Sequence, residues 1–179
     1  MSIRRVVTGH NASGKSVVVS DGAPPRSVEF KHVPGMSAAL VWETTTGQQV
    51  GGHPIDRTPT ASWVPGAGGT NLMFVTFPPD AVMARPGLDP MAAGVEYMQN
   101  LPGLAEKFEM ESPGMHTTDS VDYAVVLDGE VCLELDDGQL VTLKQHDAVV
   151  QNGTRHAWRN RSDRPVTMLF VLTAATRSR

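Results

Sequence analysis

Short apolar runs rich in β-branched residues, separated by turn residues, recur along most of the chain. Runs of this kind, spaced 8–12 residues apart, are typical of the strands of an antiparallel sandwich or barrel. A hairpin is predicted from Ile3–Thr8 and Ser16–Ser20. The other predicted strands are Glu29–Val33, Ala38–Thr45, Asn71–Phe77, Met115–Leu127, Glu130–Leu135, Gln139–Leu143, Asp147–Val150, Arg155–Asn160 and Val166–Thr173.

One segment interrupts this strand pattern. Apolar residues at helical spacing predict a helical region over Met91–Phe108, broken at Pro102-Gly103. Thr46–Gly69 carries clusters of Gly, Pro and Thr and is predicted to be a loop. The fold class predicted is therefore all-β, with one short helical insertion.

Composition narrows the possible partners. The 179 residues suit one domain, and the net charge of −4 provides no basic face for nucleic acid. No stretch of 18 apolar residues is present and the N-terminus lacks an apolar signal core, so we expect a cytoplasmic protein without a membrane partner. Cys132 is the single cysteine, which excludes an internal disulfide.

The segment Gly9–Ser16 matches the P-loop pattern G-x-x-x-x-G-K-S. A P-loop holds phosphate at the start of the helix that follows it. Here a β-branched run, Val17-Val18-Val19, follows instead. We therefore interpret the segment as a hairpin turn.

Two strand segments carry the candidate chemistry. Side chains alternate faces along a strand, so His116, Thr118 and Asp122 are expected on one face. By the same rule His156 and Trp158 share a face. If both faces line one barrel interior, it contains two imidazoles and a carboxylate among apolar residues. Such buried groups need partners, and a divalent metal is one of them. Asn160 is expected to satisfy turn backbone.

These two segments resemble the two motifs of the cupin family, H-x-H-x₃₋₄-E-x₆-G and P-x-G-x-x-H-x-x-x-N. His116 fits the first histidine, Thr118 stands where the second would be, and Asp122 replaces the glutamate, six residues before Gly129. In the second motif Gly153, His156 and Asn160 match, and Gln151 replaces the proline. The resemblance covers about residues 71–173.

The resemblance implies a cupin or jelly-roll β-barrel over residues 71–175, with residues 1–70 as an N-terminal strand extension that packs on it. It implies one divalent metal (Fe, Zn, Mn or Ni) held by His116, Asp122 and His156. Without a metal, Asp122 and His156 could form an acid/base pair, and these two are the predicted catalytic residues. The predicted substrate pocket consists of Thr118, Gln151, Trp158 and Met115.

Three functions stay open at this point. The first is a metal-dependent lyase or isomerase, a dehydratase or decarboxylase, acting on a small apolar or aromatic oxygenated metabolite. Cupins with this threonine and aspartate resemble accessory proteins of secondary metabolism. The alternatives are a non-haem Fe(II) dioxygenase and a non-catalytic small-molecule-binding cupin that lacks metal. We expect a homodimer, because exposed sheet edges tend to pair.

Overall fold

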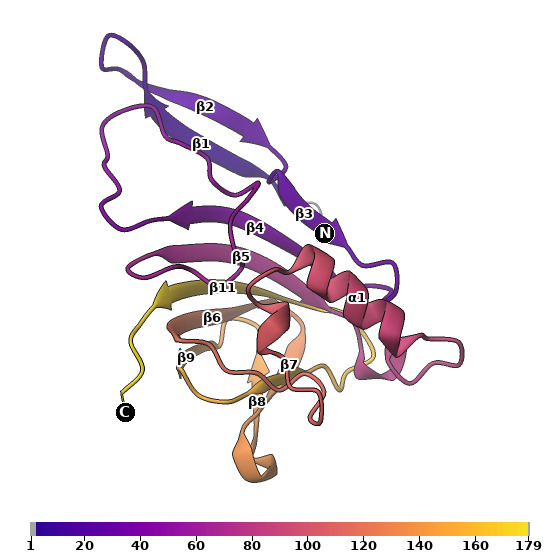
Figure 1. The fold of residues 1–179 in the computed structure, drawn as a ribbon. Coiled ribbons are helices and arrows are strands. Elements are labelled where there is room, and N and C mark those ends of the chain that lie inside the picture. The colour runs from indigo at the N-terminus through magenta and orange to yellow at the C-terminus, as the bar shows by residue number, and fades with distance from the viewer. Residues whose placement is uncertain (1–2, 179) are drawn as a thin grey trace.

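A computed structural model describes residues 3–178 and confirms the all-β class (Figure 1). The largest sheet has six strands in the order β3-β4-β5-β11-β6-β9, and every neighbouring pair in it is antiparallel. Its strands are β3 (Arg26–Glu29), β4 (Ser37–Thr44), β5 (Thr70–Phe77), β6 (Ser120–Asp128), β9 (Ala148–Asn152) and β11 (Val166–Ala174). Strands β3 and β4 come from the segment predicted as the extension and extend the sheet beyond β5.

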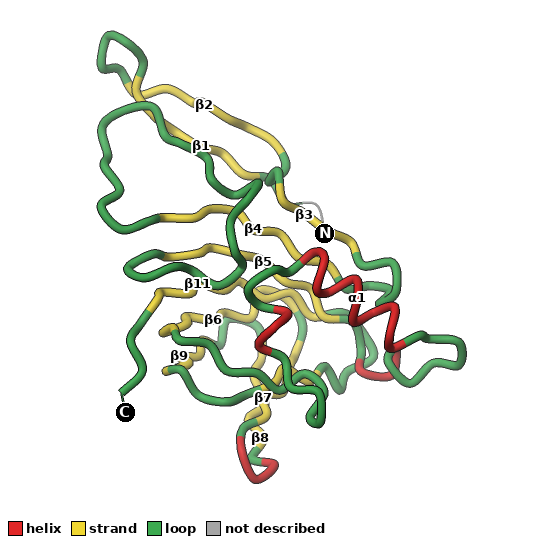
Figure 2. Tube along the Cα trace, in the orientation of Figure 1, coloured by secondary structure: helices red, strands yellow, loops and turns green. Residues whose placement is uncertain are grey.

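Two smaller sheets contain the other strands of residues 3–178 (Figure 2). One has the order β10-β7-β8, with β7 (Glu130–Glu134), β8 (Leu140–Lys144) and β10 (Ala157–Arg159). The other is the hairpin of β1 (Arg5–His10) and β2 (Ser16–Gly22), which stands at the far end of the molecule from β7 and β8. The P-loop-like segment thus spans the turn of this hairpin and continues into β2.

The buried face of the large sheet follows the strand alternation. Met73 and Val75 on β5, with Phe170 and Leu172 on β11, are all less than a tenth exposed. Their neighbours in sequence are more accessible. This alternation buries one face of the sheet and leaves the other partly open. The loop before β5 adds Trp63, which is fully buried in the same core.

One predicted strand is wrong. The strand expected at Glu29–Val33 lies earlier, at Arg26–Glu29, and residues 31–35 form bends and a turn. Local hydrogen bonds explain the difference: the N–H of Phe30 donates to the carbonyl of Met36, and the N–H of Met36 donates to that of Val33, both at 3.0 Å. These bonds close a turn over the residues predicted to extend the strand. The apolar Phe30 and Val33 are buried in the core from this turn rather than from a strand.

The helical insertion begins at Pro90 and ends at Asn100, forming α1 (Pro90–Asn100). Asp89 caps it by accepting hydrogen bonds from the N–H groups of Met91 and Ala92, with Pro90 in the first turn. A 3-10 helix at Ala105–Lys107 follows the predicted break. Glu96 fixes α1 to the turn before β4, because its carboxylate accepts from the backbone N–H groups of residues 31 and 32 at 2.8 Å.

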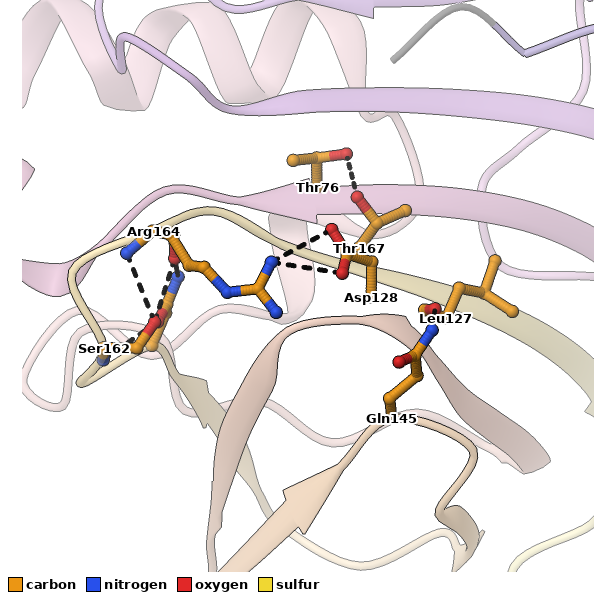
Figure 3. Close-up of polar contacts among 8 residues, drawn as sticks. Thr76, Leu127, Asp128, Gln145, Ser162, Arg164 and Thr167 are labelled. Atoms are coloured by element: carbon orange, nitrogen blue, oxygen red, sulfur yellow. Dashed lines mark hydrogen bonds and ion pairs between the residues drawn. The ribbon is translucent and has the colours of Figure 1, made fainter.

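Polar contacts fasten the end of the sheet where β11 begins (Figure 3). The Arg164 guanidinium contacts the Asp128 carboxylate at 3.1 Å, which ties the approach to β11 to the end of β6. The hydroxyls of Thr76 and Thr167 lie 3.0 Å apart across β5 and β11. These contacts fix the register of β5, β6 and β11 at one end of the sheet. Asp122 lies near the opposite end of β6.

Within residues 3–178, no helix is long and apolar enough to cross a membrane. The homodimer stays a prediction.

Candidate functional site

A cavity of about 620 Å³ opens between the large sheet, β10 and the helical insertion. Apolar and aromatic side chains from both the sheet and the insertion form most of its wall. The lining includes aromatic and polar residues from several segments, namely Trp63, Phe77, Tyr97, Phe108, His116, Thr118, Asp122, His156, Trp158, Arg159 and Phe170. The cavity brings together five residues predicted from the sequence, namely His116, Thr118, Asp122, His156 and Trp158.

Backbone pairing brings the two histidines together. The N–H of His116 donates to the carbonyl of His156 at 2.9 Å, and the N–H of His156 donates to the carbonyl of His116 at 3.0 Å. This reciprocal pair is an isolated antiparallel bridge, so both side chains leave the backbone on the same side. Their ring centroids are 4.3 Å apart. Both residues are less than a tenth exposed.

Hydrogen bonds fix the tautomer of each ring. Nδ1 of His116 lies 3.1 Å from the carbonyl oxygen of Gly114, and Nδ1 of His156 lies 2.9 Å from that of Thr154. A carbonyl oxygen only accepts, so each neutral ring carries its proton on Nδ1. The lone pair of each neutral imidazole is therefore on Nε2.

Burial keeps both imidazoles uncharged. Loss of hydration lowers the pKa of His116 below its ordinary value. Loss of hydration, together with a smaller effect of the neighbouring His116, lowers the pKa of His156 to about 4. Near neutral pH the pair thus presents two hydrogen-bond acceptors and no positive charge.

Asp122 lies on β6 with an incomplete hydrogen-bond shell. The Ser120 hydroxyl donates to Thr118 Oγ1 at 2.9 Å, and the Thr118 hydroxyl donates to Asp122 Oδ2 at a long 3.4 Å. Asp122 Oδ1 is buried and has no partner among the described residues. Burial raises the pKa of this carboxyl despite the two hydroxyls. Asp122 therefore holds a proton more readily than an ordinary aspartate.

Two predicted pocket residues do not line the cavity. Met115 is buried one position before His116, so the strand-like alternation directs its side chain away from that of His116. Gln151 lies opposite Asp122 in the β6–β9 register, but its Oε1 accepts from Thr154 at 2.9 Å. This contact uses only the amide oxygen, and Gln151 Nε2 is buried with no partner among the described residues.

His116, Asp122 and His156 do not form the three-residue metal site predicted from the motifs. Among residues 3–178, no group of three or more His, Cys, Asp or Glu side chains is arranged to hold a metal ion. The two Nε2 atoms are suitable donors, but they form only a pair. Asp122 has one methylene fewer than the glutamate of the motif, and the Thr118 hydroxyl donates a hydrogen bond to its carboxylate. We therefore derive no step through a metal.

Asn160 satisfies turn backbone, as expected. Its side-chain amide donates to the carbonyls of Phe77 and Arg164 at 3.0 and 2.8 Å. The cavity wall also contains Tyr97 and Phe108, which the sequence analysis did not assign to the pocket. The available signal was two aromatic residues in the one predicted helical segment.

Comparisons with known proteins agree with the motifs. The family model described as Cupin domain matches residues 107–172. The chain is 35% identical over 165 residues to phomopsin biosynthesis cluster protein C' of Diaporthe leptostromiformis, which covers 88% of this chain and 70% of that protein. It is 39% identical over 77 residues to oryzines biosynthesis cluster protein J of Aspergillus oryzae, covering 43% of this chain and 39% of that protein. It is 38% identical over 61 residues to the cupin-domain-containing oxidoreductase virC of Hypocrea virens, covering 32% and 31%.

Proposed function

The chain belongs to the cupin superfamily, and on that premise we propose that it is a lyase- or isomerase-type enzyme of secondary metabolism. Its substrate is a small apolar or aromatic oxygenated metabolite, and its chemistry is proton transfer at carbon. The relatives named for the phomopsin and oryzines biosynthesis clusters support the setting. The groups on the cavity wall support the chemistry.

One observation carries the proposal. A neutral imidazole pair and a buried carboxyl with a raised pKa lie together on the wall of an otherwise mostly apolar cavity. Burying these groups costs free energy that a purely apolar wall avoids. Polar groups held at such a cost in a cavity are typical of a reacting site.

The residues divide the proton transfer between them. The Nε2 atom of His116 or His156 accepts a hydrogen bond from the hydroxyl of the substrate's enol form. Asp122, whose pKa is raised, delivers its proton to the adjacent carbon while the enol hydroxyl passes its own proton to that Nε2, which leaves an Asp122 carboxylate and an imidazolium. In the reverse direction the carboxylate takes the proton from carbon and the imidazolium returns one to the oxygen. Thr118 holds Oδ2 of the carboxyl in place. The apolar wall excludes water from the reacting carbon.

The O₂-dependent oxidoreductase is the second candidate. It is favoured by the similarity to virC over 61 residues, and it corresponds to the Fe(II) dioxygenase alternative. The motifs predict a divalent metal (Fe, Zn, Mn or Ni) for the lyase or isomerase as well, but this candidate requires a redox-active ion such as Fe(II). Elemental analysis of untagged protein, repeated on His156→Ala, decides between the candidates. A stoichiometric metal that disappears in the variant, together with O₂ consumption, would favour the second candidate.

The test of the first candidate uses 2-tetralone, an aromatic ketone with enolisable C–H bonds. We expect the protein to accelerate exchange of these hydrogens for deuterium in D₂O, measured by proton NMR against buffer alone. Exchange does not require O₂, so the rate should be the same under nitrogen. Binding without any exchange would instead identify a non-catalytic binding cupin.

A further inference from the structure

Aromatic rings form an unbroken series along the cavity. The contacts run from Phe30 through Tyr97, Phe108, the two histidines, Trp158 and Phe170 to Phe77, with centroids 4.3–6.4 Å apart. Every member except Phe30 lines the cavity. The imidazole pair lies in the middle of this series. A ligand whose hydroxyl reaches Nε2 therefore has aromatic rings on both sides of the pair.

The positively charged side chain of the wall is already paired. Arg159, the cationic side chain among the described lining residues, contacts Glu134 and donates to the carbonyl of Pro113 at 2.8 Å. Glu109 is held by Arg155 at 2.6 Å. Among the described residues no other Arg or Lys side chain lines the cavity, so an anionic ligand finds no free guanidinium or ammonium on this wall. The cavity thus disfavours carboxylates and phosphates.

The imidazole pair favours a ligand that can donate a hydrogen bond. Nδ1 of each ring donates to a backbone carbonyl, so Nε2 is the ring atom left to accept a hydrogen bond from a ligand. A ligand that places an ether or carbonyl oxygen beside the two Nε2 atoms displaces their water but donates no hydrogen bond to either of them. A ligand hydroxyl satisfies one of them directly.

Tyr97 connects this series to the insertion. Its ring packs edge-on to Phe30 at 5.0 Å and stacks with Phe108 at 6.1 Å. Burial and the nearby Glu96 raise the pKa of its phenol to about 12, so it stays uncharged. Because Glu96 fixes the same helix to the turn before β4, the ring is held at the cavity wall.

From these contacts we propose that the cavity selects a planar aromatic ligand bearing an un-ionised hydroxyl group. The hydroxyl donates to Nε2 of His116 or His156, and the ring is bounded by Trp158 on one side and Phe108 on the other. Tyr97 supports Phe108 from the insertion and determines the preference for a flat ring. The proposal rests on the function above, because it names the substrate class of the same site.

Calorimetric titration with four probes of similar size tests it on the unmodified protein. The probes are 2-naphthol, its methyl ether 2-methoxynaphthalene, the anion 2-naphthoate, and the saturated alcohol 2-decalol. We expect 2-naphthol to bind at least about tenfold more tightly than each of the others, since a lost hydrogen bond or aromatic contact of about 1.4 kcal/mol gives that factor. Equal binding of the ether, the anion or the saturated alcohol overturns the proposal.

Substitutions of Tyr97 test whether its aromatic ring sets the preference for a flat ligand. Tyr97→Phe keeps the ring and should leave the preference for 2-naphthol over 2-decalol unchanged. Tyr97→Leu should reduce that preference at least about threefold, within the range of aromatic pair energies. Tyr123→Leu is the matched control, because Tyr123 is 50% exposed on β6 and does not line the cavity. An unchanged preference in Tyr97→Leu contradicts the role given to Tyr97.

The two proposals fail in different ways. If 2-naphthol is preferred but 2-tetralone does not exchange, the ligand class stands and proton transfer is wrong. If 2-tetralone exchanges but the ether binds as tightly as the naphthol, the ligand class is wrong and proton transfer stands.

Discussion

Asp122→Asn is expected to lower the rate of 2-tetralone exchange by about 10²–10⁴-fold, the contribution of a positioned acid/base group. The amide has nearly the shape of the carboxyl but cannot carry the proton. The measurement is deuterium incorporation by NMR at equal protein concentration. Asp163→Asn is the matched control, because Asp163 is exposed in the turn before β11. A variant that keeps the wild-type rate would remove Asp122 from the mechanism.

The same substitution should make the protein more stable near neutral pH. Burial raises the pKa of Asp122 above its unfolded value, so the folded state favours the protonated carboxyl. Wild-type stability is therefore greatest below the unfolded pKa and decreases as the pH rises through the folded pKa. Asn removes this dependence. Thermal unfolding should show a higher Tm for Asp122→Asn at pH 7, with the advantage shrinking below pH 4. Lower stability at pH 7 would contradict the account of a charge buried for function.

Trp63→Ala is expected to cost about 3–5 kcal/mol of unfolding free energy, the usual loss for a large aromatic side chain in a core. Trp63 is fully buried, lines the cavity and has the Arg26 guanidinium 5.7 Å from its ring centroid. Its backbone N–H donates to the carbonyl of Pro102 at 2.9 Å. The residue thus joins the loop before β5 to the helical insertion.

The unfolding free energy is measured by chemical denaturation monitored by circular dichroism. In a separate thermal unfolding experiment, Tm should decrease by on the order of 10 °C. Val50→Ala is the control, because Val50 is 95% exposed in the same loop. We expect the control to change stability by less than about 0.5 kcal/mol. A loss below about 1 kcal/mol in Trp63→Ala would show that the loop does not form part of the core.

Alternation along strands made the site partly predictable from sequence. The face shared by Thr118 and Asp122 follows from spacing alone, although the strand begins only at Ser120 and His116 takes part in isolated bridges. Extended backbone outside a named strand keeps the same alternation. The predicted convergence of His116 and His156 holds because their backbones pair directly.

The rest of the cavity depends on contacts between distant segments. Nothing in the loop sequence around Trp63 distinguishes a core residue from an exposed one, and its position depends on Pro102, 39 residues away. Likewise, Tyr97 and Phe108 reach the cavity only because the insertion forms part of its wall. The predicted metal centre depended on how far a carboxylate reaches, which a motif pattern does not specify.

The protonation of His156 is the most direct test of the central claim, that the cavity presents neutral imidazoles with free Nε2 atoms to a ligand. Imidazole proton and nitrogen shifts of chelator-treated protein, recorded by NMR from pH 3.5 to 8, report both charge and tautomer. The account predicts a His156 pKa of about 4 and a proton on Nδ1 at pH 7. A pKa at or above the ordinary value of about 6.5, or a proton on Nε2 at pH 7, would contradict it.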